Sequence, residues 1–194
     1  MRCFVAIELD AATRDTLAEV SGIICRESLA WCDEKWVSPS NLHVTLAFLG
    51  EVEEDALEQL REWLTVIVAE TTPFELGPLS LRAVPSPSRT TMLWAHLEDP
   101  SGACATLATS IATSCAELGP ESRREDRRPF KAHVTLCRAR RPRRLDARVL
   151  EVANEAVLGH EVMMSVPRVS LFSSRLTPRG PIYTVVGTWL MRGE

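Results

Sequence analysis

The tetrapeptide His-Val-Thr-Leu occurs twice in this chain, at residues 43–46 and 133–136, although the protein has only four histidines. The surroundings of the two copies are also alike. Each copy is predicted to be a strand that is followed by about ten residues of connection, an amphipathic helix and two further strands. Such an internal duplication constrains the fold strongly, because both halves of the chain must build similar units of structure.

The hydrophobic periodicity predicts seven strands and four helices. The predicted strands span 2–9, 42–49, 74–83, 91–97, 131–138, 161–172 and 182–191, and the predicted helices span 11–29, 53–70, 100–118 and 145–157. Proline and glycine mark loops at 85–88, 119–129 and 178–181. We therefore expect a single α+β domain over residues 1–194. It should have two pseudo-symmetric lobes, each an antiparallel sheet backed by helices, with one motif per lobe facing a central cleft.

Successive side chains of a strand point to opposite faces. In the first copy this alternation places Val44, Leu46 and Phe48 on the core face, and His43 and Thr45 on the other face. The second copy repeats the arrangement with its own histidine and threonine. Two such strands facing one cleft would present two imidazoles and two hydroxyls to a single ligand.

This set of groups suits phosphoryl chemistry without a metal or another cofactor. Histidine is the side chain whose ordinary pKa lies nearest to neutral pH, so His43 and His133 are candidates for an acid and base pair. The hydroxyls of Thr45 and Thr135 can hold phosphate oxygens. A lone His-x-Thr is more often structural, and a duplicated module could keep the motif for packing in both lobes. His96 lies outside the repeats, as does His160, and we expect both to be structural.

The charge distribution favours a polyanionic partner. Residues 122–148 hold 11 of the 22 basic residues, ten of them arginine, against three acids, although the whole chain carries a net charge of −4. Guanidinium groups suit phosphate recognition; the alternative is a solvated arginine-rich loop without a ligand. No apolar stretch approaches the roughly 18 residues of a membrane span, and the chain shows no secretory signal. We expect a cytoplasmic monomer with no membrane partner.

The chain resembles the two-histidine phosphoesterase superfamily, and within it the RNA 2′,3′-cyclic phosphodiesterases, also called 2′-5′ RNA ligases. The resemblance covers nearly the whole sequence. Its most specific part is the pair of His-x-Thr motifs with the extension His-x-Thr-Leu-x-Phe-Leu-Gly. The segments that carry it are 2–7, 36–37, 41–50, 129–138, 171–176 and 180–183.

The resemblance implies metal-independent opening of a terminal 2′,3′-cyclic phosphate of RNA to a 2′-phosphomonoester, and in some members 2′-5′ ligation of RNA such as tRNA halves. It makes His43 and His133 the catalytic pair and assigns phosphate binding to Thr45, Thr135 and Arg138. Strict alternation puts Arg138 on the face opposite the histidine, so a bulge after residue 136 would be needed.

Several alternatives stay open at this point. One is a phosphodiesterase for 2′-5′ oligonucleotides or small cyclic phosphates, and another is a non-catalytic RNA-binding module. Phe48 might stack on a base, but its phase in the strand favours the core. Tyr183 and Phe130 could border the cleft or be structural. Ala132 stands where the family usually has proline, which puts the rigidity of that loop in question.

Overall fold

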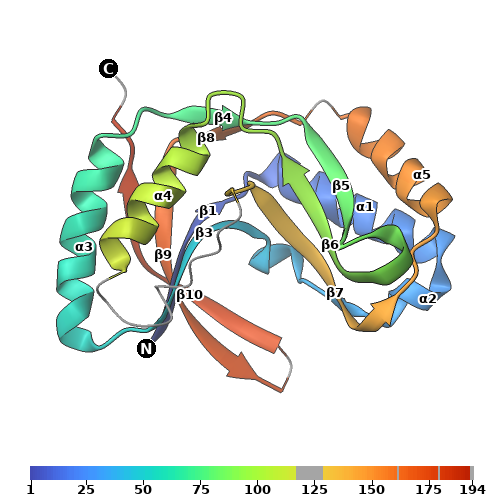
Figure 1. Ribbon diagram of the computed structural model, residues 1–194, viewed down its shortest axis with the longest axis horizontal. Coiled ribbons are helices and arrows are strands. Elements are labelled where there is room, and N and C mark those ends of the chain that lie inside the picture. Colours follow the sequence, from blue (N-terminus) through green and yellow to red (C-terminus); the bar gives the residue numbers. More distant parts are fainter. Residues whose placement is uncertain (117–128, 161, 179, 193–194) are drawn as a thin grey trace.

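The computed structural model describes residues 1–116, 129–160, 162–178 and 180–192, and Figure 1 shows their arrangement. The predicted order of elements is confirmed over this part of the chain, with a short helix and a short strand in addition. The elements are β1 (Arg2–Glu8), α1 (Ala11–Glu27), α2 (Leu29–Cys32), β2 (Lys35–Trp36), β3 (His43–Glu51), α3 (Glu54–Ala69), β4 (Phe74–Leu76), β5 (Leu79–Val84), β6 (Thr90–Leu97), α4 (Ala103–Cys115), β7 (His133–Arg143), α5 (Ala147–Leu158), β8 (Met164–Val166), β9 (Arg168–Thr177) and β10 (Gly180–Leu190).

The two halves of the chain meet in one antiparallel sheet, where separate sheets were expected. Among the described residues this sheet has eight strands, in the order β10-β9-β1-β3-β7-β6-β5, with β2 paired to β7 beside β3. The two motif strands join through one register pair, Val44 with Val134, and both valines are fully buried. The two copies of the motif are therefore neighbours at the middle of the sheet.

Each side of the sheet mixes strands from both halves of the sequence. On the N-terminal side, β1 pairs with β3 and also with β9 from the second half. On the other side, β7 from the second half pairs with β6, which in turn pairs with β5, and both β5 and β6 come from the first half. The short strands β4 and β8, one from each half, form a second sheet of two strands. The duplication is therefore interleaved in space, so neither half of the sequence builds its part of the sheet alone.

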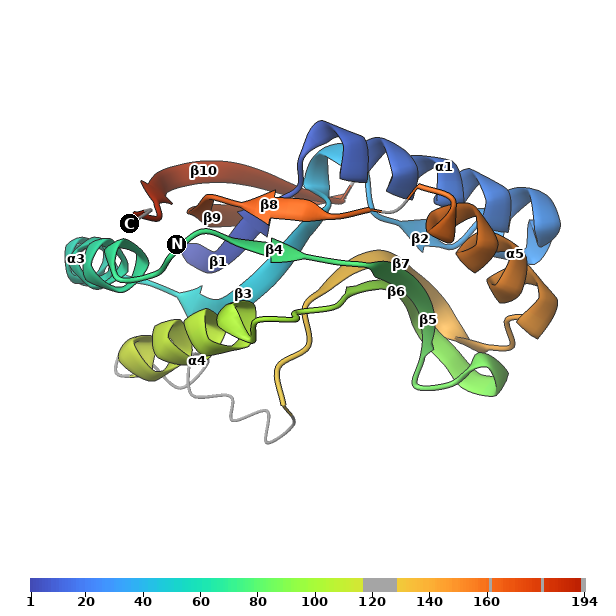
Figure 2. The same ribbon diagram turned by 90° about the horizontal axis from the view of Figure 1, so that it is seen from above.

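Helices lie at both ends of the sheet, as Figure 2 shows: α3 and α4 at one end, and α1 and α5 at the other. Side-chain caps fix where several of them begin. Asp10 accepts a hydrogen bond from the amide of Thr13 (2.7 Å) at the start of α1, and Asp146 caps α5 in the same way. Within the described residues, no helix is long and apolar enough to cross a membrane.

Local chemistry accounts for most differences from the predicted boundaries. The strand expected over 74–83 is divided at Gly77-Pro78, and the strand over 161–172 is divided at Pro167, because proline cannot donate to a strand ladder. Helix α4 begins at Ala103, later than expected, although the Asp99 carboxylate still accepts the amide of Ala105 (2.9 Å).

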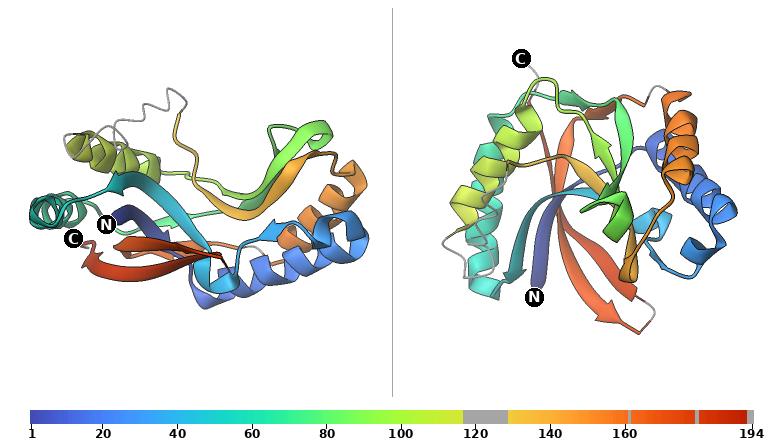
Figure 3. Two further views of the ribbon diagram at one scale, coloured as in Figure 1. Left: turned by 90° about the horizontal axis from the view of Figure 1, so that it is seen from below. Right: turned by 45° about the vertical axis from the view of Figure 1, so that its right-hand side comes forward.

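The end of the chain also differs from the prediction. The expected loop at 178–181 is shorter, since β10 already begins at Gly180 and pairs with β9 from Thr177. The resulting β9–β10 hairpin extends beyond the rest of the sheet (Figure 3). It is tied to the segment before β3 by a hydrogen bond from the Asn41 side chain to the carbonyl of Pro181 (3.0 Å).

Candidate active site

Both motif histidines lie on the same face of the sheet. Paired residues of neighbouring strands point the same way, so the buried pair of Val44 and Val134 fixes the other face as the one carrying His43 and His133. The motif threonines lie on this face too, and all four side chains are half-buried. We call this surface the motif face. The structure thus brings together the four residues that the duplicated motif predicted.

The two imidazoles are held in the same way. The Nδ1 atom of His43 lies 2.7 Å from the carbonyl oxygen of Asn41, and that of His133 lies 2.8 Å from the carbonyl oxygen of Lys131. A carbonyl only accepts hydrogen bonds, so Nδ1 of each ring carries the proton and donates it. Each Nε2 is therefore left to take up or give a proton. The loop before His133 has Ala132 in place of proline, but it is still held in position, because the carbonyl of Ala132 accepts a hydrogen bond from the amide of Leu97 (3.0 Å).

A bulge in β3 overturns the expected position of Phe48. The register with β1 passes from Thr45 to Ala47 and leaves Leu46 out, and Leu46 and Ala47 are both buried. The extra residue shifts the alternation by one. Phe48 is consequently 62% exposed and lies on the motif face, with its ring centroid 6.1 Å from that of Phe4. The prediction of a core position was wrong because it assumed unbroken alternation.

Strand β7 has the same bulge at the equivalent place. Its register with β6 passes from Thr135 to Cys137 and leaves Leu136 out. The amide of Val37, just after β2, binds the carbonyl of Leu136 (2.8 Å). Arg138 therefore returns to the motif face, as the resemblance required. Its guanidinium raises the positive potential at both histidines, lowering their pKa values.

Aromatic rings surround His43. Its ring centroid lies 4.8 Å from that of Phe4 and 6.3 Å from that of Phe172, and Tyr183 meets it edge-on at 5.4 Å. Of the two residues suggested as borders of a cleft, Tyr183 lies at the site, whereas Phe130 is partly buried against the hydrophobic core. The aromatic cluster and the exposed ring of Phe48 give this side of the motif face an apolar character.

A tryptophan that the sequence reasoning missed contacts the other histidine. Trp94 of β6 stacks on His133 with ring centroids 3.9 Å apart and an angle of 25° between the planes. The strand pairing explains this, because Trp94 is opposite Thr135 and His96 is opposite His133. The alternation of β6 puts Trp94 and His96 on one face, but only the strand order shows that β6 borders the second motif.

Burial lowers the pKa of both imidazoles below the ordinary value of 6.5, and it is the largest cause in each case. The hydrogen bonds to Asn41 and Lys131 act in the opposite direction, because they favour the charged ring. The positive charges of His133 and Arg138 lower the pKa of His43 further. The two histidines come from neighbouring strands, which join through Val44 and Val134. In the free protein at neutral pH both rings are mainly neutral.

Part of the arginine-rich segment is engaged within the protein. Arg143 contacts the carboxylate of Glu34, and Arg140 donates its backbone amide to the same carboxylate (2.6 Å). These contacts fix the turn between α2 and β2. Burial raises the pKa of Glu34, but the hydrogen bonds and charges of Arg140 and Arg143 outweigh it, so the pKa is lowered. Arg140 and Arg143 of the predicted polyanion-binding band therefore have structural roles, whereas Arg138 lies on the motif face and its role in binding stays a prediction. The arginines at 123–128 lie outside the described residues.

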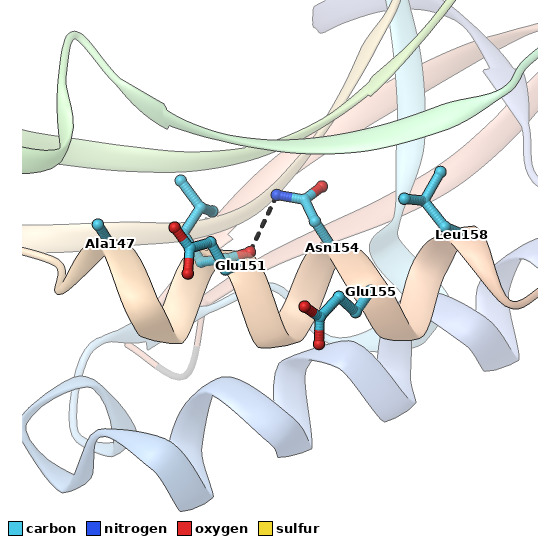
Figure 4. Close-up of a pocket in the computed structure, with 6 residues that line it drawn as sticks. Ala147, Glu151, Asn154, Glu155 and Leu158 are labelled. Atoms are coloured by element: carbon cyan, nitrogen blue, oxygen red, sulfur yellow. Dashed lines mark hydrogen bonds between the residues drawn. The ribbon is translucent and has the colours of Figure 1, made fainter.

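A surface hollow lies away from the motif face, on α5 (Figure 4). It is lined by Ala147, Leu150, Glu151, Asn154, Glu155 and Leu158. Asn154 has a structural role there, because its side chain accepts the amide of Leu81 (2.7 Å) and donates to the carbonyls of Leu81 and Leu150. It thereby satisfies the free edge of β5, and no predicted site residue contributes to this hollow.

Comparison with known proteins agrees with this geometry. Residues 24–175 match the family described as the 2′-5′ RNA ligase superfamily. The RNA 2′,3′-cyclic phosphodiesterase of Archaeoglobus fulgidus is 33% identical over 94% of this chain and 96% of its own length. That of Methanothermobacter thermautotrophicus is 30% identical over 95% of each chain. The family resemblance inferred from the motifs is confirmed.

Solved structures share the fold. The structure of TT0787 from Thermus thermophilus matches with a TM-score of 0.79 and 27% identity over the full length of both chains. The apo structure of LigT from E. coli matches with a TM-score of 0.70 and 23% identity, over 98% of this chain and 96% of that one. At that identity the second match supports the fold alone.

Proposed function

Since the chain belongs to the 2′-5′ RNA ligase superfamily, we propose that it is an RNA 2′,3′-cyclic phosphodiesterase, which opens the terminal cyclic phosphate of RNA to a 2′-phosphomonoester without a metal. The observation that carries this proposal is the pair of imidazoles, each held through Nδ1 by a main-chain carbonyl, on one face of adjacent strands. In this proposal residues 1–194 form one bilobal domain, and the motif face lines a central cleft between the lobes.

The surroundings of each histidine support an assignment of roles. The apolar cluster beside His43 suits the terminal base and ribose, with the exposed ring of Phe48 available for stacking. His43 would then lie nearest to the ribose, and its Nε2 proton goes to the departing O3′. His133, on the cationic side, takes a proton from water through its Nε2. The water oxygen forms a bond to phosphorus as the bond to O3′ breaks, which leaves the phosphate on O2′.

Three further residues would hold the phosphate during this step. The hydroxyls of Thr45 and Thr135 donate to its non-bridging oxygens, and Arg138 neutralises the charge that builds up on them. Residues on both strands would thus fix the phosphorus between the two imidazoles for in-line displacement. A substrate phosphate also raises the pKa of the nearby rings, which provides the protonated His43 that the reaction needs.

The same geometry supports 2′-5′ ligation as a second reaction. If the 5′-hydroxyl of another RNA end replaces water, His133 takes the proton of that hydroxyl and His43 again protonates O3′. The product is a 2′-5′ phosphodiester, as the family description suggests. RNA ends such as those of cleaved tRNA are suitable substrates for both reactions.

The test is hydrolysis of a short RNA ending in a 2′,3′-cyclic phosphate, in EDTA, with 2′- and 3′-phosphate products separated by chromatography. We expect 2′-phosphate from the wild type and no product from the folded double variant His43→Asn/His133→Asn. Formation of 3′-phosphate would contradict the assigned leaving group. Absence of turnover by a folded wild type would favour 2′-5′ oligonucleotides or small cyclic phosphates as substrates, or an RNA-binding module without catalysis.

A further inference from the structure

The motif face continues beyond His133 onto β6 and β5. The strand register places His96 opposite His133 and Ser80 opposite His96, while Trp94 lies opposite Thr135 and has its own partner on β5. Paired residues share a face, so these side chains form two parallel rows that lead away from the catalytic pair. One row consists of His133, His96 and Ser80. The other consists of Thr135, Trp94 and Arg82.

Three polar atoms in these rows lack a partner. Ser80 Oγ, Trp94 Nε1 and His96 Nδ1 are buried and make no hydrogen bond within the described part of the chain. His96 Nδ1 lies 3.4 Å from Glu98 Oε1. This contact is an ion pair only when the imidazole is protonated. Buried polar groups normally find partners. Three such groups on adjacent strands therefore indicate a place where a ligand supplies the missing hydrogen bonds.

The charges around this cluster indicate an anionic ligand. The strand register places His133 opposite His96, and Arg82 opposite Trp94, so two positive or potentially positive groups adjoin the cluster. Burial is the largest cause that lowers the pKa of His96; Arg82, Lys131 and His133 lower it further, whereas Glu98 raises it. Within the described ranges, an acid in contact with the cluster is Glu98, which is 3.9 Å from the Arg82 guanidinium, and both side chains are 52% exposed. An exposed pair at that distance is weak, so an incoming phosphate can replace Glu98 as the partner of Arg82.

We propose that Ser80, Arg82, Trp94 and His96 form a second phosphate subsite, which binds the phosphodiester on the 5′ side of the terminal nucleotide. This inference rests on the proposed function and narrows it, because it makes the substrate an oligonucleotide of at least two nucleotides. Adjacent strands are about 4.8 Å apart, so the backbone of β5 lies about 10 Å from that of β7. The rows therefore lead away from the cyclic phosphate.

The subsite gives the RNA a direction across the sheet. The terminal base lies toward Phe48 and the aromatic cluster around His43, and the cyclic phosphate lies between the two histidines. The chain then leaves over β6 and β5, where the phosphodiester accepts from the half-exposed guanidinium of Arg82. One half of the motif face would thus bind the last base, and the other half would bind the backbone that precedes it.

The experiment compares two substrates that differ only in the preceding nucleotide: a nucleoside 2′,3′-cyclic phosphate, and a dinucleotide ending in the same group. The variants are Arg82→Gln and Ser80→Ala, with Arg148→Gln as a matched control. Arg148 belongs to the basic segment 122–148, but it lies on α5, away from the motif face, where it is exposed and paired with Glu151. We expect Arg82→Gln to lower kcat/KM on the dinucleotide about tenfold or more, mainly through KM. The mononucleotide rate should change less than about twofold, and so should every rate of Arg148→Gln.

Two further readouts separate binding from folding. Ser80→Ala removes an unpaired buried hydroxyl, so it should leave the melting temperature unchanged or higher while it raises KM for the dinucleotide alone. The slope of log kcat/KM against log salt for the dinucleotide should fall by about 0.7 in Arg82→Gln, as expected for one lost phosphate contact on a single strand.

The outcomes are distinguishable. Equal losses on both substrates, or no loss on either, would overturn the second subsite while turnover of the mononucleotide by the wild type still supports the proposed function. If the folded wild type turns over neither substrate, the proposed function fails, and the subsite fails with it.

Discussion

The two motif strands are built alike yet differ at one equivalent position. In both strands the histidine donates to a carbonyl two residues earlier, and a leucine bulge follows the threonine. The residue that the bulge brings onto the motif face is Phe48 in β3 and Arg138 in β7. One copy of the module thus adds an apolar ring, and the other adds a positive charge.

The neighbouring strands extend this difference. Around His43 lie Phe4, Phe172 and Tyr183, whereas the strands beside His133 carry Trp94 and a cationic edge at Arg82. A duplicated module can therefore keep the same acid and base chemistry in both copies while each copy specialises in a different part of one ligand. In our account these parts are the base and the phosphate backbone.

The largest effects should come from the histidines, and the leaving group should distinguish them. His43→Asn and His133→Asn should each lower kcat on a cyclic phosphate about 10²- to 10⁴-fold, the usual contribution of a positioned acid or base. On an aryl phosphodiester, whose leaving group needs no proton, His43→Asn should recover most of its rate and His133→Asn should not. Recovery by His133→Asn instead would reverse the assigned roles.

Arg138→Gln should be the next most damaging change. Loss of a charged hydrogen bond costs about 1.5–3 kcal/mol, so kcat/KM should fall about 10- to 150-fold on every phosphodiester. Because both histidine pKa values lie below 6.5 and Arg138 lowers each of them, the wild-type pH optimum of kcat/KM should lie below about 6.5 and should move upward in the variant. A pH–rate profile checks this, and an unchanged optimum would exclude Arg138 from the site.

Phe48→Ala should have a smaller and more selective effect. Stacking of a base on an aromatic ring is worth about 1–3 kcal/mol, so KM for a nucleotide substrate should rise roughly tenfold. Turnover of a phosphodiester without a base should not change. Because the ring is exposed, the melting temperature should also stay the same. Equal effects on both substrates would argue against a base-binding role.

Trp94→Leu should have the smallest overall effect on activity. An aromatic pair contributes about 0.5–1.5 kcal/mol beyond its buried area, so we expect kcat to fall two- to tenfold through looser positioning of His133. Phe4→Leu is the matching change beside His43. A pH–rate profile separates positioning from simple destabilisation, because only a displaced imidazole should alter the pH dependence of kcat.

The sequence predicted much of this site because its strongest signals are local. The repeated His-x-Thr placed four polar groups on one face, and strict alternation is valid as far as Thr45 and Thr135. It fails after the leucine, where Leu46 and Ala47 are both buried. The family resemblance predicts a bulge that exposes Arg138 in β7, and a bulge at the equivalent position in β3 exposes Phe48.

Other features depend on tertiary pairing and have no local signal. The pair β5–β6 from the first half joins β7, and the pair β9–β10 from the second half joins β1. This exchange follows from which strands pair, as does the contact of Trp94 with His133. Strand β2 is only two residues long, too short for a periodicity to be visible. Arg140 and Arg143 contact Glu34 at the turn between α2 and β2, and this structural role is also visible only in the folded protein.

The most direct test of the central claim is an NMR titration of both histidines, with and without a nucleoside 2′-monophosphate as a product analogue. The account predicts that both pKa values lie below 6.5 in the free protein and that one equivalent of the nucleotide raises both, because one phosphate faces both rings. A response of only one histidine, or a second equivalent needed for the other, would contradict the claim that the two strands act on a single phosphate.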